Sequence, residues 1–236
     1  MPGRFLTAEW RHLLMLNYAI DPRVLTPFLP RGTELDLFEG RCFVSVVGFW
    51  FLRTRLLGVP IPFHVAFEEI NLRFYVLRGT KRGVVFLKEV VDRRAVSLVA
   101  RWVYNENYAT HRTASEIRPP SGDGPGVVGY RWQQGERWNS AQAEIHGEPS
   151  APATGSLEHF LVEHYFGYTR QRDGGTMEYE VRHPPWKLYE TRNAAFDCDV
   201  AGFYGPEFVA ALSAKPTSAF VADGSAVEVY RGVRVA

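Results

Sequence analysis

The spacing of apolar and polar residues predicts β-strands along most of the chain. In residues 67–76, FEEINLRFYV, an extended backbone sorts the side chains onto two faces. One face carries Ile70, Leu72, Phe74 and Val76. The other carries Glu69, Asn71, Arg73 and Tyr75. This second face either meets water or lines an enclosed space. The alternation places Glu69 on this face and Glu68 on the opposite one.

The neighbouring segments extend this pattern into a sheet. Residues 84–92 form a second strand, joined to the first by the turn RGTKRG, and strands at 34–38 and 42–52 flank a tight turn at 38–41. Further hairpins are predicted at 130–147 and at 218–232, the latter around an Asp223-Gly224 turn. Residues 194–205 read as a strand in which Phe196, Cys198 and Val200 alternate with aspartates.

Helical spacing is confined to short segments. It occurs in 21–30 with Asp21 as N-cap, in 92–102 with Asp92 as N-cap, in 156–171 with Ser156 as N-cap, and in 206–214. About ten strands and three or four short helices indicate an α+β protein that is mainly antiparallel β. The two polar loops at 118–129 and 148–156 separate no independently patterned halves, so residues 1–236 are predicted to form a single domain.

Composition narrows the class of protein. Hydrophobic residues make up 46% and aromatic residues 14%, enough for a sizeable core. The 27 basic and 26 acidic residues nearly cancel without forming a like-charged block, which argues against a nucleic-acid partner. The N-terminus lacks the features of a signal peptide and no segment has the apolar length of a membrane helix, so a cytoplasmic protein without a membrane partner is expected.

Sequence motifs for cofactor chemistry are missing. The chain has no phosphate-binding loop, dinucleotide fingerprint, nucleophile elbow or HExxH helix, and no cofactor is expected. Cys42 and Cys198 are predicted to be reduced and buried. His159 and His164 are five residues apart and diverge on a helix, so no metal site is predicted there. His64 and His183 lie beside prolines. Each imidazole either packs within a turn or lies at the mouth of a cavity.

Charged residues concentrate in the 67–92 hairpin and the segment after it. The group comprises Glu68, Glu69, Arg73, Lys88, Glu89, Asp92, Arg93, Arg94 and Arg101. On a solvated face these residues form cross-strand ion pairs, each of which contributes little to the free energy of unfolding. Inside a closed sheet they form a receptor for a small carboxylic acid, because buried charges require partners.

Several segments carry a resemblance to a known family. The order LLMLNYAIDPRVLTPFLPRGTELDLFEGRCFVSVVGFWFL, FEEINLRFYV, RGVVFLKEVVDRRAVSLVARWVYNENY and HYFGYTRQRDGGTMEYEVRHPPWKLYE resembles the uncharacterised YqjF-like family, DUF2071. That family is more distantly similar to the acetoacetate decarboxylase superfamily. The resemblance implies a double-layered antiparallel β cone or barrel around a central cavity.

The resemblance to the decarboxylases can be followed residue by residue. It places Glu69 at the position of an active-site glutamate and keeps Asp92 and Arg101. It fails at Arg94, which replaces a second glutamate, and at Ala109-Thr110-His111, which stands where the decarboxylases carry their Schiff-base lysine. Acetoacetate decarboxylase activity is therefore not expected, and a relocated amine at Lys88 is a minor alternative.

Two functions remain open on the sequence. In the first, a polar cavity binds a small oxo- or carboxylate-bearing metabolite, with or without lyase- or hydrolase-like acid/base chemistry on a keto acid. Its catalytic candidates are Glu69, His111 and Tyr75. Its substrate-binding candidates are Arg73, Arg101, Asn71, Asp92 and Lys88. In the second, the domain is structural or binds a partner, and its interior is packed with aromatic side chains. A homo-oligomer is compatible with either function.

Overall fold

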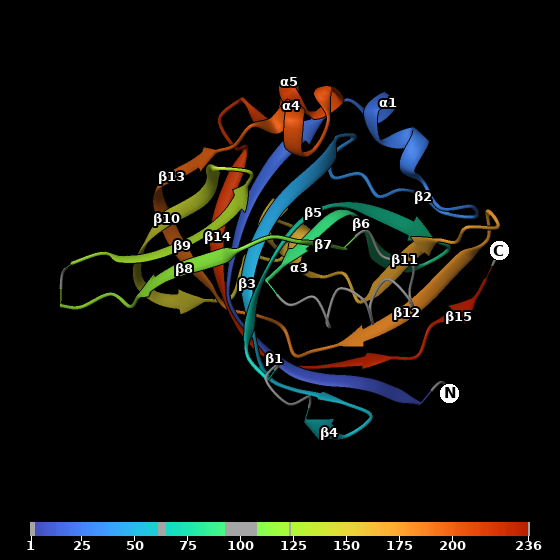
Figure 1. The fold of residues 1–236 in the computed structure, drawn as a ribbon, viewed down its shortest axis with the longest axis horizontal. Helices are drawn as coiled ribbons and strands as arrows, with labels where there is room; N and C mark the ends of the chain where they lie inside the picture. Colours follow the sequence, from blue (N-terminus) through green and yellow to red (C-terminus); the bar gives the residue numbers. More distant parts are fainter. Residues whose placement is uncertain (1–2, 61–64, 93–107, 123, 236) are drawn as a thin grey trace.

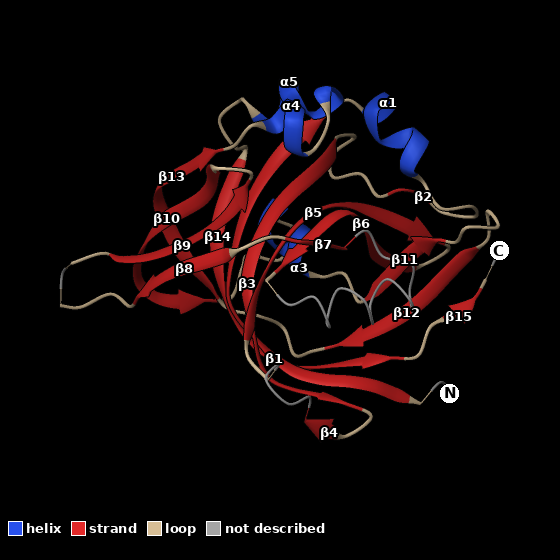
Figure 2. Cartoon of the chain, in the orientation of Figure 1, coloured by secondary structure: helices blue, strands red, loops and turns tan. Residues whose placement is uncertain are grey.

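The computed structural model describes residues 3–60, 65–92, 108–122 and 124–235. It contains one 15-stranded sheet and a few short helices (Figures 1 and 2). The strands are β1 Arg4–Ile20, β2 Glu34–Leu35, β3 Cys42–Leu56, β4 Val59–Pro60, β5 Phe67–Arg78, β6 Lys81–Val91, β7 Tyr108–Thr110, β8 Thr113–Arg118, β9 Gly126–Gln134, β10 Arg137–Ser150, β11 Phe166–Arg170, β12 Thr176–Arg182, β13 Leu188–Asp197, β14 Ser218–Tyr230 and β15 Val233–Arg234. The α-helices are α1 Pro22–Leu25, α3 Leu157–Val162, α4 Val200–Phe203 and α5 Val209–Leu212, with 3-10 turns at Thr26–Phe28 and Pro206–Phe208.

Seven strands close into a ring. They follow the order β12-β11-β6-β5-β3-β1-β14, and β14 pairs back to β12 through Val181↔Val229 and Arg182↔Glu228. The pairings around the ring are antiparallel except for β6 with β11, so the predicted mainly antiparallel sheet is confirmed. The inner faces of these strands point into the ring and their outer faces away from it.

A second layer covers part of the outer face of the ring. The sheet continues from β14 through β13, β10, β9 and β8, which lie together at the left of Figure 1. Tyr130 of β9 packs against β3 at Gly48, where an added Cβ would lie 2.5 Å from the Tyr130 ring. Ser115 of β8 accepts a hydrogen bond from Trp50 Nε1 (3.1 Å). These contacts hold the second layer against β3.

The alternation along β5 divides the core in two. Ile70, Leu72, Phe74 and Val76 are fully buried between the ring and the second layer. Tyr75 belongs instead to the cluster inside the ring, which it shares with Phe49, Phe51, Phe67 and Val91. The predicted assignment of the two faces of this strand is confirmed, and both faces are buried.

Two predicted strand elements differ from the observed ones. Asp223 and Gly224 lie within the continuous strand β14, and Gly224 with φ +79° pairs with Arg11, so the predicted hairpin turn is wrong. A side chain at position 224 would place its Cβ 2.0 Å from Trp10 O, so only glycine fits there. The strand predicted through Val200 ends at Asp197, and Asp199 then caps α4.

The helical predictions have mixed outcomes. Asp21 caps α1 and Ser156 caps α3 as predicted, through bonds from Arg23 N and His159 N. α3 ends at Val162, which is earlier than predicted, and residues 166–170 belong to β11. The helix predicted from Asp92 falls outside the described residues, as does His64. Among the described helices, none is long and apolar enough to span a bilayer.

Candidate functional site

The ring of strands encloses a cavity of about 220 Å³. Its wall is formed by the inner faces of β1, β3, β5, β6, β11, β12 and β14 and by the segment that follows α3. Most lining side chains are apolar or aromatic. We call the group Glu69, Asn71, Arg73 and Glu89 the polar end of the cavity. These four side chains are at most 8% exposed, so the cavity contains deeply buried ionisable groups.

A bulge in β6 decides which side chains of that strand reach the cavity. Val84 and Phe86 line the cavity, as does Glu89. The inward-facing positions therefore change from even to odd residue numbers between residues 86 and 89. The register shifts at the same place, from Leu72↔Lys88 to Arg73↔Phe86. The extra residue turns Glu89 inward beside Asn71 and turns Lys88 to the outer face.

Glu69 is held by two donors inside the cavity wall. Its Oε1 accepts from Asn71 Nδ2 (3.0 Å) and its Oε2 from the Tyr108 hydroxyl (2.9 Å). Burial raises the pKa of Glu69 to about 7, although both hydrogen bonds and the Arg73 charge act in the opposite direction. The group can therefore exchange a proton near neutral pH.

Arg73 is a buried cation without an ion-pair partner among the described residues. It is 8% exposed, and its Nη2 lies 3.6 Å from the Met15 sulfur, a weak acceptor. Its Nε meets no acceptor in the described part of the chain, and the Oδ1 of Asn71 meets no donor there. A guanidinium in this setting favours an anion in the cavity, because a buried charge is stable only when it is paired.

His164 lines the cavity from the segment after α3. Its Nε2 lies 3.1 Å from Asp36 Oδ2, which also accepts from Arg82 Nε (2.8 Å). Burial lowers the pKa of His164 to about 4, so the ring is neutral at pH 7. Nε2 also lies 3.3 Å from Arg82 Nη2, so the tautomer decides whether Nε2 donates to Asp36 or accepts from Arg82, and Nδ1 has no partner among the described residues.

Tyr75 packs against the His164 ring, with the two ring centroids 4.6 Å apart. Its hydroxyl lies 2.6 Å from Ser45 Oγ, whose own proton goes to Asn17 Oδ1 (2.6 Å). Tyr75 therefore donates to Ser45, and it is not among the residues that line the cavity.

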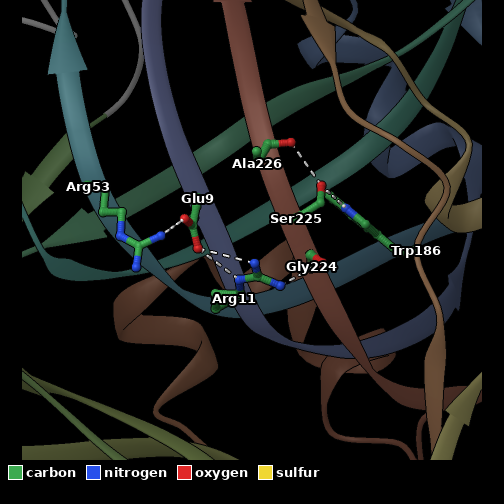
Figure 3. Close-up of polar contacts among 7 residues, drawn as sticks. All are labelled: Glu9, Arg11, Arg53, Trp186, Gly224, Ser225 and Ala226. Carbon is green, nitrogen blue, oxygen red and sulfur yellow. Dashed lines mark hydrogen bonds and ion pairs between the residues drawn. The ribbon is translucent and has the colours of Figure 1, made fainter.

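Aromatic side chains form the wall beyond the polar end. Trp10 meets Phe49 and Phe51 edge-on at 5.3 and 5.7 Å, and His183 stacks on Trp186 at 4.1 Å. Figure 3 shows Trp186 reaching toward β14, where its Nε1 donates to Ser225 Oγ (2.9 Å). On β1, Glu9 bonds to Arg11 and to Arg53 of β3, and Arg11 bonds to Gly224 O (Figure 3). These bonds tie β3, β1 and β14 together behind the aromatic wall.

The Ser225→Ala variant is expected to lower the free energy of unfolding by about 1 kcal/mol and to weaken ligand binding severalfold, because Trp186 loses its hydrogen bond. Ser115→Ala is the matched control, since Ser115 accepts from Trp50 away from the cavity. Urea unfolding and calorimetric titration measure the two effects. An equal loss of affinity in both variants would contradict the role of Trp186 in the cavity wall.

Several sequence candidates lie elsewhere. Lys88 donates to Phe203 O (2.6 Å) on the outer face of β6, and His111 packs 5.4 Å from the Phe203 ring. Neither lines the cavity, whereas His183 does. Asp92 is exposed just after β6, and Arg101 falls outside the described residues. Lys81, Lys187 and Lys215 also do not line the cavity, so none of the chain's four lysines does.

His164 and Glu89 are the site residues that the sequence did not single out for this role. Glu89 belongs to the charged group of the hairpin, but simple alternation places it on the face opposite Val84 and Phe86. His164 depends on Asp36, which is 128 residues away. No local pattern signals that contact.

The chain matches one family model over residues 7–226, that of DUF2071, described as an "Uncharacterized conserved protein". The chain belongs to the DUF2071 family. The uncharacterized protein YqjF of Bacillus subtilis (strain 168) is 34% identical to this DUF2071 chain over 187 residues, which cover 76% of this chain and 73% of YqjF. The predicted family is confirmed.

Solved structures share the fold of this DUF2071 protein. The enduracididine biosynthesis enzyme MppR complexed with pyruvate has a TM-score of 0.68 and 13% identity, covering 100% of this chain and 91% of that one. An acetoacetate decarboxylase-like enzyme from Sphingomonas wittichii RW1 has a TM-score of 0.68 and 15% identity, covering 99% and 94%. The acetoacetate decarboxylase from Legionella pneumophila has a TM-score of 0.67 and 14% identity, covering 100% and 88%. The predicted acetoacetate decarboxylase-like fold is confirmed, and at these identities the likeness concerns the fold alone.

Proposed function

We propose that the cavity binds a small oxo- or carboxylate-bearing metabolite and that Arg73 holds its carboxylate. The observation that carries this proposal is the buried guanidinium of Arg73, whose Nε has no acceptor among the described residues. A carboxylate in the cavity supplies the missing counter-charge and a planar pair of acceptors. The pyruvate bound to MppR, a protein of the same fold, is a molecule of this class.

The other polar groups suit the rest of such a ligand. Glu69 in its protonated form donates to an oxo group, and in its ionised form it removes a proton from the carbon beside that group. Asn71 Oδ1 and His164 Nδ1, both without described partners, hydrogen-bond to a hydroxyl or enol of the ligand. We assign proton exchange to Glu69 rather than to His111 or Tyr75, which do not line the cavity.

The chemistry proposed for this site does not use an amine. A Schiff base requires a lysine in contact with the ligand, and none of the four lysines lines the cavity. Lys88 carries a pKa lowered by burial, but its ammonium group lies 3.9 Å above the Phe203 ring, on the outer face of β6. Borohydride in the presence of pyruvate is accordingly expected to leave the protein unmodified.

The alternative of a structural domain expects a packed interior. A cavity of about 220 Å³ with buried ionisable groups favours ligand binding over that alternative.

Pairs of acids and amides test the proposal. Pyruvate and propanoate are expected to raise the melting temperature in a concentration-dependent manner, whereas pyruvamide and propanamide, of nearly the same shape, leave it unchanged. Differential scanning fluorimetry at constant ionic strength measures the shift. Flat curves for the acids, or equal shifts for acids and amides, would contradict the binding of a carboxylate.

A further inference from the structure

The apolar part of the cavity lies far from the polar end. We call the group Leu6, Leu56, Val181 and Val229 the apolar end; all four line the cavity. They are neighbours across three strand pairs, because Leu6 pairs with both Leu56 and Val229, and Val181 pairs with Val229. The apolar end is therefore one continuous patch on β1, β3, β12 and β14.

Strand β3 gives the separation of the two ends. Glu69 pairs with Phe49 of β3, and Leu56 lies seven residues further along the same strand. The stretch contains a bulge at Arg53 (φ +52°), and its other residues are extended, so the two positions lie roughly 20 Å apart along the strand. The space between is lined by Phe51, Phe67 and Trp10, of which the first two stack at 4.7 Å. The cavity is thus elongated, with its charged groups at one end and a mainly apolar and aromatic lining along the remainder, where Tyr179 and His183 flank Val181.

Exposure shows which end meets solvent. Leu6, Leu56 and Val229 are half-buried, whereas Glu69, Asn71 and Glu89 are no more than 2% exposed. A two- or three-carbon acid at Arg73 would leave the aromatic stretch and the apolar end unfilled.

From this geometry we infer that the ligand is a monocarboxylic acid with an extended apolar tail, a long-chain acid whose medium-chain and arylalkyl analogues fill only the aromatic stretch. Its carboxylate lies at Arg73 and its tail follows Phe67 and Phe51 toward Leu56 and Val229. The inference rests on the proposed function and adds the class of ligand and its orientation. A second charge on the tail is disfavoured, because the described lining around the apolar end offers only Tyr179 and His183 and no acidic, lysine or arginine side chain.

A series of acids of increasing length tests this inference by calorimetric titration. The probes are acetate, butanoate, hexanoate, octanoate, hexadecanoate and 3-phenylpropanoate, with octan-1-ol as an apolar chain that lacks a carboxylate. Affinity is expected to rise about three- to fourfold for each added methylene until the cavity is filled, the change expected from burying a CH₂ group. Octan-1-ol is expected to bind at least tenfold more weakly than octanoate.

Two variants locate the tail. Val229→Trp places an indole at the apolar end and is expected to weaken hexadecanoate, which is long enough to reach that end, at least tenfold while leaving acetate and octanoate unchanged. Val233→Trp is the matched control, since Val233 is 41% exposed and does not line the cavity. If Val229→Trp does not fold, Leu56→Trp serves the same purpose from β3.

The outcomes separate the two proposals. Equal affinity for all acids, with binding lost in Arg73→Met, would overturn the apolar tail and leave the carboxylate site in place. Octanol binding as tightly as octanoate would overturn the proposed orientation. If no acid binds at any length, the proposed function itself fails.

Discussion

Replacing Arg73 with methionine is expected to weaken carboxylate binding about 100-fold and, in the absence of ligand, to raise the free energy of unfolding by about 1–3 kcal/mol. Binding falls because one or two charge-assisted hydrogen bonds to the ligand are lost. Stability rises because the wild-type protein buries a cation whose Nε has no described acceptor, and methionine fills a similar volume without charge. Calorimetric titration and urea unfolding measure the two effects.

Arg192→Met is the control for Arg73→Met. Its side chain is 63% exposed and pairs with Glu190 on the surface, so both stability and binding are expected to stay near wild type. A variant at Arg73 that keeps full affinity would contradict the proposed role of the guanidinium. A large loss of stability without ligand would show that Arg73 has a structural partner.

The Glu69→Gln variant is expected to be more stable than the wild type above pH 7, with an advantage that disappears toward pH 4.5. The folded-state pKa of Glu69, about 7, is above its ordinary value of 4.5, so the native protein binds more protons than the unfolded chain between these values. Wild-type stability therefore falls as pH rises through this window, by up to about 3 kcal/mol. Glutamine does not titrate, so the difference between the two proteins isolates the contribution of Glu69.

Urea unfolding at intervals between pH 4.5 and 8 measures that difference. Glu68→Gln is the matched control, because the neighbouring carboxylate accepts from Thr113 and Ser115 on the opposite face of β5. A pH dependence of equal size in Glu68→Gln, or none in Glu69→Gln, would contradict a raised pKa at the cavity carboxyl group.

The arrangement of β5 could be predicted because it depends on local alternation. A two-residue period assigns each side chain to a face, and Glu69, Asn71 and Arg73 line the cavity as a consequence. That this face lines a cavity and does not meet solvent depends on ring closure. The closure comes from the pairing of β12 with β14, some 48 residues apart at Val181 and Val229, and only the family resemblance supplied it at the sequence level.

The remaining errors come from backbone irregularities and distant contacts. The β6 bulge reverses the alternation after Phe86 and exchanges the places of Lys88 and Glu89. Gly224 resembles a hairpin turn in sequence, but its positive φ serves a close approach to β1 within a continuous strand. A bulge or a close approach is set by the partner strand, so periodicity in one segment does not reveal it.

The most direct test of the carboxylate site is a crystal structure of the protein with a bound acid, octanoate or pyruvate. The carboxylate is expected inside the ring, with one oxygen about 2.7–2.9 Å from Arg73 Nε or a terminal nitrogen of its guanidinium. The remainder of the ligand is expected to extend past Asn71 and Glu69 and along Phe67 and Phe51. A ligand carboxylate bound elsewhere, with the Arg73 guanidinium paired to a carboxylate of the protein, would contradict the proposed carboxylate site.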